Sequence, residues 1–285
     1  MKKLALLLLA ICAGCGGSGG GAGTVPSTIR NGGSGIPSPL PSPLPTGSAS
    51  TRYWIIQGPA ALAMANDPEA LRYFSDPNHM MILPVNQTAP STWQSRKMET
   101  FTSFAQFQSA VSVNAIDPRT SALIYDNESW SFTPANEQAD PATYTAQFAS
   151  LAHAHGWAVI ASHAGANSSA GLDIIAGMCQ FADSYSIQSQ GTEASLAAFS
   201  NQVITTATAC RSANPRIKVF AGVSTGPSGQ VVTAQQIADA IESVSTAVDG
   251  YWLNIPQNSP YCPRCTNFDP AIASQAIALL PTPGP

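Results

Sequence analysis

Short apolar runs alternate along the chain with longer stretches whose apolar residues recur at helical spacing. Seven runs predict strands, because each is brief, rich in branched and aromatic side chains, and bounded by polar residues, glycine or proline. These strands span residues 52–57, 80–85, 122–125, 157–161, 182–188, 217–223 and 250–255. The intervening segments predict helices at 68–74, 100–113, 141–155, 171–181, 193–213, 234–248 and 270–280, with N-caps at Asp67, Asp140 and Thr233.

Strands separated by helices pair in parallel and are covered on both faces, which predicts an α/β fold. Seven strands are one fewer than a (β/α)8 (TIM) barrel contains, but the 36 residues between Val85 and Ala122 leave room for another. A doubly wound sheet is the alternative, although no G-x-G-x-x-G or G-x-x-x-x-G-K phosphate loop is present. We therefore expect one domain over residues 52–285, a (β/α)8-type barrel that is irregular or incomplete.

The N-terminal residues carry a different pattern. A basic start precedes an apolar stretch, residues 4–11, that is too short to span a bilayer. Ala13-Gly14-Cys15 resembles a bacterial lipoprotein signal, which implies a signal peptide over residues 1–15 and lipidation of Cys15. Cys12 stands where that signal usually has leucine, so ordinary cleavage nearby stays open. We expect an exported protein, at the cell surface, on a periplasm-facing membrane or secreted, with a lipid anchor in the membrane.

Residues 16–51 predict a linker, since they hold ten Gly, six Pro and seven Ser. Such a composition buries too little apolar surface to offset its ordering entropy. The remaining 234 residues carry 9 basic and 16 acidic residues. This balance argues against a polycationic nucleic-acid binder, and we expect no nucleic-acid partner. Because 44% of the chain is apolar, wholesale disorder is excluded too.

Export also affects how the cysteines are interpreted. The predicted domain contains Cys179, Cys210, Cys262 and Cys265, an even number in an oxidising compartment. Cys262-Pro-Arg-Cys265 is compatible with a metal knuckle or a redox pair, but no second C-x-x-C accompanies it. We therefore expect disulfide bonds rather than zinc, with a small pinned loop at Cys262–Cys265 and a bridge between two helices at Cys179–Cys210.

Polar residues gather where the predicted strands end. In a barrel, the C-terminal ends of the strands and the loops that follow them carry the chemistry. Amides and aromatic rings there suit uncharged, hydroxyl-rich ligands, so we expect a carbohydrate substrate or ligand, although polar residues terminate strands in any barrel. The strand-end residues are Gln57, Asn86, Asp126, Glu128, His163, Gln188, Gln190, Ser224, Trp252 and Asn254.

Asp126-x-Glu128 is the most specific of these features. Two positions apart on a strand, both carboxylates point to one face, with Cβ atoms roughly 6.5–7 Å apart. Like charges this close raise the pKa of one partner and keep a proton available for acid catalysis. Tyr125 and Trp130 are expected to add an apolar wall with the same effect. The alternative is an acidic pair that faces a loop or caps the next turn.

Asp126-Asn127-Glu128 resembles the end of the D-x-x-D-x-D-x-E motif of the family 18 chitinase-like glycoside hydrolases. The resemblance implies that Glu128 is the general acid, that Asp126 orients the substrate, and that the substrate itself supplies the nucleophile. Ile124 and Ser121 stand where the earlier two aspartates of the motif belong. Asn127-Glu128 is also similar to the acid/base pair of the large barrel glycosidase clan, which needs a second, later glutamate.

These features predict a glycoside hydrolase, in which sugar subsites form around the carboxyl pair. A non-catalytic carbohydrate-binding or cell-surface barrel is the alternative. His163 with the two carboxylates is compatible with a divalent metal, but we expect a hydrogen-bonding histidine, no metal and no cofactor. The expected subsite residues are Gln57, Asn86, Tyr125, Trp130, His163, Tyr185, Gln188, Gln190, Trp252 and Asn254.

Overall fold

A computed structural model of the chain provides the structure. It describes residues 53–57, 60–61, 64, 66–74, 79–82, 91, 93–165, 168–227, 230–256 and 269–281. The signal peptide with Cys15, the linker, Asn86 and the Cys262–Cys265 pair lie outside the described residues. The predictions made for them therefore stay predictions.

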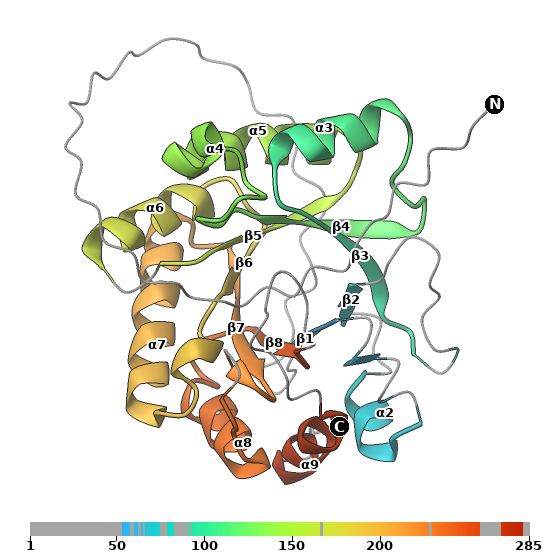
Figure 1. Ribbon diagram of the computed structural model, residues 1–285, viewed down its shortest axis with the longest axis vertical. Coiled ribbons are helices and arrows are strands. Elements are labelled where there is room, and N and C mark those ends of the chain that lie inside the picture. The colour runs from blue at the N-terminus through green and yellow to red at the C-terminus, as the bar shows by residue number, and fades with distance from the viewer. Residues whose placement is uncertain are drawn as a thin grey trace.

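Eight parallel strands form a closed barrel, in which β8 pairs with β1 (Figure 1). All seven predicted strands are confirmed, with shifted ends, and the eighth is β3, in the interval where the sequence left room for it. The prediction of an α/β barrel is thus confirmed, and its irregularity lies in a short β2 and a register shift between β3 and β4. The strands are β1 (Tyr53–Gln57), β2 (Met80–Ile82), β3 (Arg96–Phe101), β4 (Thr120–Asp126), β5 (Ala158–His163), β6 (Ser184–Ile187), β7 (Lys218–Ser224) and β8 (Gly250–Asn254).

The helices lie outside the ring of strands (Figure 1). The three predicted N-caps accept hydrogen bonds from the first turns of their helices: Asp67 in α2, Asp140 in α5 and Thr233 in α8. The helices are α2 (Pro68–Phe74), α3 (Phe104–Ser112), α4 (Ala135–Ala139), α5 (Pro141–Ala154), α6 (Ser169–Cys179), α7 (Leu196–Ala213), α8 (Ala234–Ser243) and α9 (Pro270–Leu279), with a 3-10 turn, η1 (Gln190–Thr192), before α7.

The prediction for residues 100–113 is corrected at its start. Phe101 belongs to β3, and the helix begins only at Phe104, after Ser103 accepts a hydrogen bond from the backbone nitrogen of Gln106. Phe101 nevertheless packs on Phe107 with ring centroids 5.3 Å apart. The apolar spacing thus reflects a shared core that joins a strand to the helix after it.

Two apolar layers follow from the alternation of side chains along each strand. On β4, Leu123 and Tyr125 face the helices, whereas Ala122 and Ile124 face the barrel interior. Register pairs continue this interior face around the ring, for example Ile124 with Ile160. The alternation therefore decides which strand-end side chains face into the barrel.

Charged side chains occupy the N-terminal end of the barrel. Lys97 Nζ lies 2.7 Å from Asp117 Oδ2, and both side chains are buried. Hydrogen bonds from Arg119 and then from Lys97 hold the pKa of Asp117 well below its usual range. Glu99 Oε1 accepts from Asp117 N at 2.9 Å and from Thr120 Oγ1 at 2.6 Å. This network anchors the starts of β3 and β4.

The predicted disulfide between Cys179 and Cys210 is confirmed. It joins the end of α6 to α7, and both residues are buried in the outer core layer. The bond therefore links two neighbouring helices of the outer ring.

Candidate active site

Two carboxyl groups occupy the C-terminal end of β4. Because Ala122 and Ile124 lie in the interior core, the alternation of the strand turns Asp126, its last residue, toward the barrel interior. Glu128 follows two residues later in the next loop. The exposed fractions of Asp126 and Glu128 are 0% and 3%, so both carboxyls are removed from bulk solvent.

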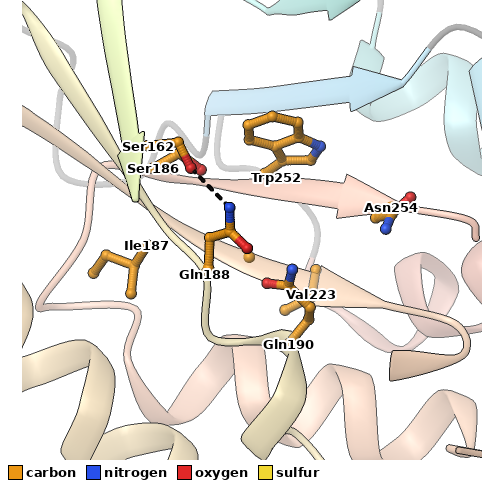
Figure 2. Close-up of a pocket in the computed structure, with 9 residues that line it drawn as sticks. Ser162, Ser186, Ile187, Gln188, Gln190, Val223, Trp252 and Asn254 are labelled. Carbon is orange, nitrogen blue, oxygen red and sulfur yellow. Dashed lines mark hydrogen bonds between the residues drawn. The ribbon is translucent and has the colours of Figure 1, made fainter. Parts of the chain in front are cut away.

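Gln188, directly after β6, joins the two carboxyls. Its side-chain nitrogen Nε2 donates to Glu128 Oε1 and lies 3.3 Å from both Asp126 Oδ1 and Ser162 Oγ. Ser162 on β5 pairs in register with Asp126 on one side and Ser186 on the other. Figure 2 shows the hydrogen bond between Gln188 and Ser162 as a dashed line. One amide group thus reaches both carboxyls of the Asp-x-Glu sequence.

Burial and proximity change the protonation of this pair. Burial raises the pKa of Asp126 well above its ordinary value, and the negative charge of Glu128 and a hydrogen bond with it raise that pKa further. Burial also raises the pKa of Glu128, while hydrogen bonds with Gln188 and Asp126 act in the opposite direction. The pair therefore keeps a proton at pH values where isolated carboxyls are ionised.

His163, the last residue of β5, contacts the same loop. Its ring nitrogen Nδ1 lies 2.6 Å from the backbone oxygen of Asn127. A carbonyl oxygen only accepts, so Nδ1 carries the ring hydrogen and Nε2 is left as an acceptor. Burial lowers the pKa of His163, which is therefore neutral at pH 7.

Thr133 fixes the loop that carries Glu128. Thr133 Oγ1 accepts from the backbone nitrogen of Glu128 at 3.4 Å and from Trp130 Nε1 at 2.8 Å. The same hydroxyl donates to the backbone oxygen of Thr102 at 2.8 Å. Trp130 is therefore half-buried in the loop and held by its indole nitrogen.

Behind the strand, a buried glutamate supports Asn127. Tyr125 OH donates to Glu137 Oε2 at 2.8 Å and accepts from Asn127 Nδ2 at 2.8 Å. Glu137 Oε2 also accepts from the backbone nitrogen of Phe104 at 2.7 Å, at the start of α3. A carboxylate is favoured at a helix N-terminus, so Glu137 ties α3 and α4 to the end of β4.

A small, partly open hollow lies beside the carboxyl pair. In Figure 2 the side chain of Gln188 points toward Ser162 and Ser186, and the indole of Trp252 projects from β8. The described lining residues supply hydroxyl, amide and apolar groups without a formal charge. They are Ser162, Ser186, Ile187, Gln188, Gln190, Gly222, Val223, Trp252 and Asn254.

Gly222 on β7 makes room for one of these amides. A Cβ atom at this position would lie 2.5 Å from Gln190 Oε1 and 2.8 Å from the backbone oxygen of Ile187. Any side chain here would therefore displace Gln190 or the end of β6. The absence of a side chain at residue 222 shapes the hollow.

The structure brings together only part of the predicted binding set. Gln188, Gln190, Trp252 and Asn254 line the hollow. Gln57 ends β1 and is buried on the interior side by strand alternation. His163 lies against Asn127, next to the carboxyl pair along the chain.

Two tyrosines that were predicted to bind the substrate face the helices instead of the barrel interior. Tyr125 and Tyr185 belong to the core layer between strands and helices, so they do not line the hollow. Tyr185 OH instead donates to the backbone oxygen of His163 at 3.2 Å. Tyr125 is likewise part of the support for Asn127 and not a wall of the pocket. Trp130 lies in the loop after β4 and is absent from the described lining.

The sequence analysis missed one buried carboxyl and five lining residues, which are Ser162, Ser186, Ile187, Gly222 and Val223. Ser162, Ser186 and Gly222 were detectable, since strand alternation places them on the interior face with Asp126. Glu193 follows η1, is 2% exposed, and accepts from the backbone nitrogen of Ser224 at 2.8 Å. Burial raises the pKa of Glu193 well above its ordinary value. No local sequence signal indicates this burial, because it results from the packing of η1 against β7.

The described part of the chain lacks both a metal-ligand cluster and a membrane-spanning helix. Among the described residues, no three His, Cys, Asp or Glu side chains form a group able to hold a metal ion. Within the same residues, no helix has both the length and the apolar character needed to cross a bilayer.

Solved structures with a similar fold are barrel proteins. The N-terminal domain of a protein provisionally described as an aldolase, from Bacteroides vulgatus, matches with TM-score 0.43 and 8% identity, over 71% of this chain and 72% of that one. The YdjI aldolase from Escherichia coli K12 matches with TM-score 0.45 and 11% identity, over 72% and 75%. A truncated 3-deoxy-D-arabino-heptulosonate 7-phosphate synthase from Thermotoga maritima matches with TM-score 0.23 and 7% identity, over 64% and 83%. No protein-family model and no curated protein matches the chain.

These neighbours correct the functional prediction. Their descriptions name aldolases and a synthase and no glycoside hydrolase, and the glycoside hydrolase prediction is not retained. The structure adds a physical departure from the motif, because Ile124 lies in the apolar interior core where the motif has an aspartate. At identities of 11% and below, the likeness concerns the fold alone and assigns no reaction to this chain.

Proposed function

We propose that this chain is an enzyme that catalyses proton transfer on a small, uncharged substrate with hydroxyl or carbonyl groups. The observation that carries the proposal is the buried pair of Asp126 and Glu128 at the C-terminal end of the barrel, where Gln188 Nε2 hydrogen-bonds to both carboxyls. Enzymes with this fold place their reacting groups at that end. Two carboxyls in different protonation states can donate one proton and accept another in the same step.

The pocket lining supports a neutral, hydroxyl-rich ligand. The amides of Gln188, Gln190 and Asn254 can both donate and accept, and Trp252 offers an apolar face. No described lining residue is cationic, so a phosphate or carboxylate group would approach the carboxyl pair without a counter-charge. A carbohydrate, the ligand class expected from the sequence, remains the class that we propose.

The positions of the lysines favour acid–base over amine chemistry. Lys97 is near the start of β3 and is paired with Asp117. Lys218 begins β7, and its Nζ lies 4.4 Å from the ring centroid of Tyr53. Both lie at the end of the barrel opposite the pocket, so the proposal includes no Schiff base between a described lysine and the substrate.

We also propose export and membrane anchoring through Cys15. The Cys179–Cys210 disulfide supports this, since such bonds persist in oxidising compartments and are rare in cytosolic proteins. Fatty-acid labelling in a bacterial host tests it: the wild type should incorporate the lipid and Cys15→Ser should not. Labelling of both proteins would contradict lipidation at this residue.

Solvent-hydrogen exchange tests the proposed reaction whatever product the enzyme forms. The full chain is incubated in D2O with glucose, fructose, glyceraldehyde and dihydroxyacetone, and deuterium uptake at carbon is followed by NMR. We expect uptake with at least one of these compounds, and a loss of at least 100-fold in Asp126→Asn and Glu128→Gln, in line with the usual contribution of acid–base catalysis. Asp239→Asn, an exposed carboxyl on α8, serves as the control.

Binding measurements separate the ligand class from the chemistry. By calorimetry, dihydroxyacetone should bind more tightly than its phosphate ester, because the lining lacks a described cation. Preference for the ester would contradict the neutral-ligand assignment. Binding without exchange, or exchange unchanged in both carboxyl variants, would refute the catalytic proposal.

A further inference from the structure

A single amide nitrogen lies among three oxygen atoms at the proposed reaction centre. Gln188 Nε2 donates to Glu128 Oε1 and lies 3.3 Å from both Asp126 Oδ1 and Ser162 Oγ. The amide has two hydrogens, so it cannot serve all three acceptors equally. Glu128 Oε1 is the closest of the three oxygens.

Gln188 and Ser162 both hydrogen-bond to the Asp126 carboxyl, yet one of its two oxygens is left without a donor among the described residues. Asp126 Oδ2 is buried and meets no N–H or O–H donor within the described residues. An ionised carboxylate needs donors at its oxygens, and burial of a charged oxygen without a donor destabilises the ionised form. A proton on Asp126 removes that destabilisation, whereas an ionised Glu128 gains strength in its bond to Gln188 because that bond becomes charge-assisted.

The other titratable groups around the pair do not alter this assignment. Tyr185 from β6 has a pKa raised by burial and by the charges of Asp126 and Glu128, so it stays a neutral phenol. His163 from β5 is neutral and hydrogen-bonded to Asn127. No described cation enters the balance of Asp126 or Glu128. The two carboxyls, the Gln188 amide and the Ser162 hydroxyl therefore decide the location of the proton.

The position of Gln188 is fixed from outside the pocket. Gln202 Nε2 on α7 donates to the backbone oxygen of Gln188 at 3.1 Å. Thr192 Oγ1 in η1 donates to Gln202 Oε1 at 2.9 Å, which orients the Gln202 amide. The Gln188 side chain therefore starts from a backbone that is held in place while substrate enters.

We propose that Gln188 is a positioning residue that leaves the shared proton on Asp126, so that Asp126 is the acid and Glu128 the base. This rests on the proposed proton-transfer function. In the step, Glu128 removes a proton from a substrate C–H group next to a carbonyl, and Asp126 gives its proton to the carbonyl oxygen, so that an enol forms. The pair then again holds one proton, which is now on Glu128. Its transfer to Asp126 restores the starting state, so no proton is consumed overall.

Carboxyl titration by NMR of the full chain labelled with 13C at Asp and Glu tests this assignment without substrate. In the wild type, Glu128 should titrate at lower pH than Asp126. Gln188→Met keeps the length and removes the donor, so it should raise the pKa of Glu128 by about one to two pH units. Gln190→Met, the same change at a lining amide with no hydrogen bond to either carboxyl among the described contacts, should leave both titrations in place.

A second variant keeps the test decisive if Gln188→Met does not fold. Asp126→Asn replaces a neutral acid by a neutral amide, so the pKa of Glu128 should change little. If Asp126 were ionised instead, its removal would lower the pKa of Glu128 markedly. Such a fall in the pKa of Glu128 would overturn the assignment. It would also be overturned if Glu128 titrated at higher pH than Asp126 in the wild type, or if Gln188→Met left both pKa values unchanged. If the titrations are as expected but no deuterium exchange occurs, the proposed function is refuted and the location of the proton is not.

Discussion

Removal of the Cys179–Cys210 disulfide should lower the free energy of unfolding by an amount that the structure fixes. The bond closes a loop across 31 residues and joins α6 to α7. In the chain-entropy relation, restricting the unfolded chain over such a loop stabilises the fold by about 3.7 kcal/mol. For a domain of this size, the corresponding fall in Tm is about 7–15 °C.

Urea unfolding with and without reductant measures this contribution. The wild type is compared with Cys179→Ala/Cys210→Ala, and the effect of reductant in the variant is subtracted from that in the wild type. The subtraction removes any effect on Cys262 and Cys265, which both proteins share. Comparison of the two proteins under reductant gives the packing lost with the two sulfur atoms. A difference of less than about 1 kcal/mol would refute the loop-closure reasoning.

Two further substitutions test the pocket end of the barrel. Gly222→Ala should lower the free energy of unfolding by about 1–3 kcal/mol, because its Cβ would meet Ile187 O at 2.8 Å. Gly191→Ala has open space at its Cβ and should change stability little, so equal effects in urea would contradict this account. The raised pKa of Glu193 means that the folded state binds a proton that the unfolded state releases, so stability falls as pH rises above about 4.3. Glu193→Gln should make that fall less steep between pH 5 and 8, and an unchanged slope would refute it.

The starts of α2, α5 and α8 were predictable because capping is local. Asp67 Oδ1 accepts from the backbone nitrogens of Glu69 and Ala70 at 2.8 and 3.2 Å, two and three residues along the chain. Thr233 and Gln236 form a reciprocal capping box in the same way. These bonds involve only neighbours, so residue type and spacing contain most of the information.

The sequence did not predict strand β3, because the residues that stabilise it lie far away along the chain. Its outward positions include Lys97 and Glu99, which make the segment look solvent-exposed along the sequence. Their burial depends on Asp117, which accepts from Lys97 Nζ and donates its backbone N–H to Glu99, about twenty residues away in the chain. Charged residues are buried only where such partners exist, and a single sequence does not name the partner.

In the candidate site, too, some residues were predictable from local spacing and others depended on the fold. The spacing of Asp126 and Glu128 indicated a carboxyl pair, because two residues on one strand face the same way regardless of the rest of the fold. The role of Gln188 depends on β6 being placed two strands away from β4, with Ser162 between them. The orientation of Tyr185 toward the helices likewise depends on the register of β6, which the sequence did not specify.

The sequence by itself determined the alternating strands and helices, the caps, the cysteine pair and the two carboxyls, since each rests on residue types at short or fixed spacings. Only the tertiary structure decided that the barrel closes between β1 and β8, and which side chains share its interior. It also decided that the carboxyls are buried beside a neutral amide. Burial and contact between distant strands set the protonation of ionisable groups, and both are properties of the packed chain.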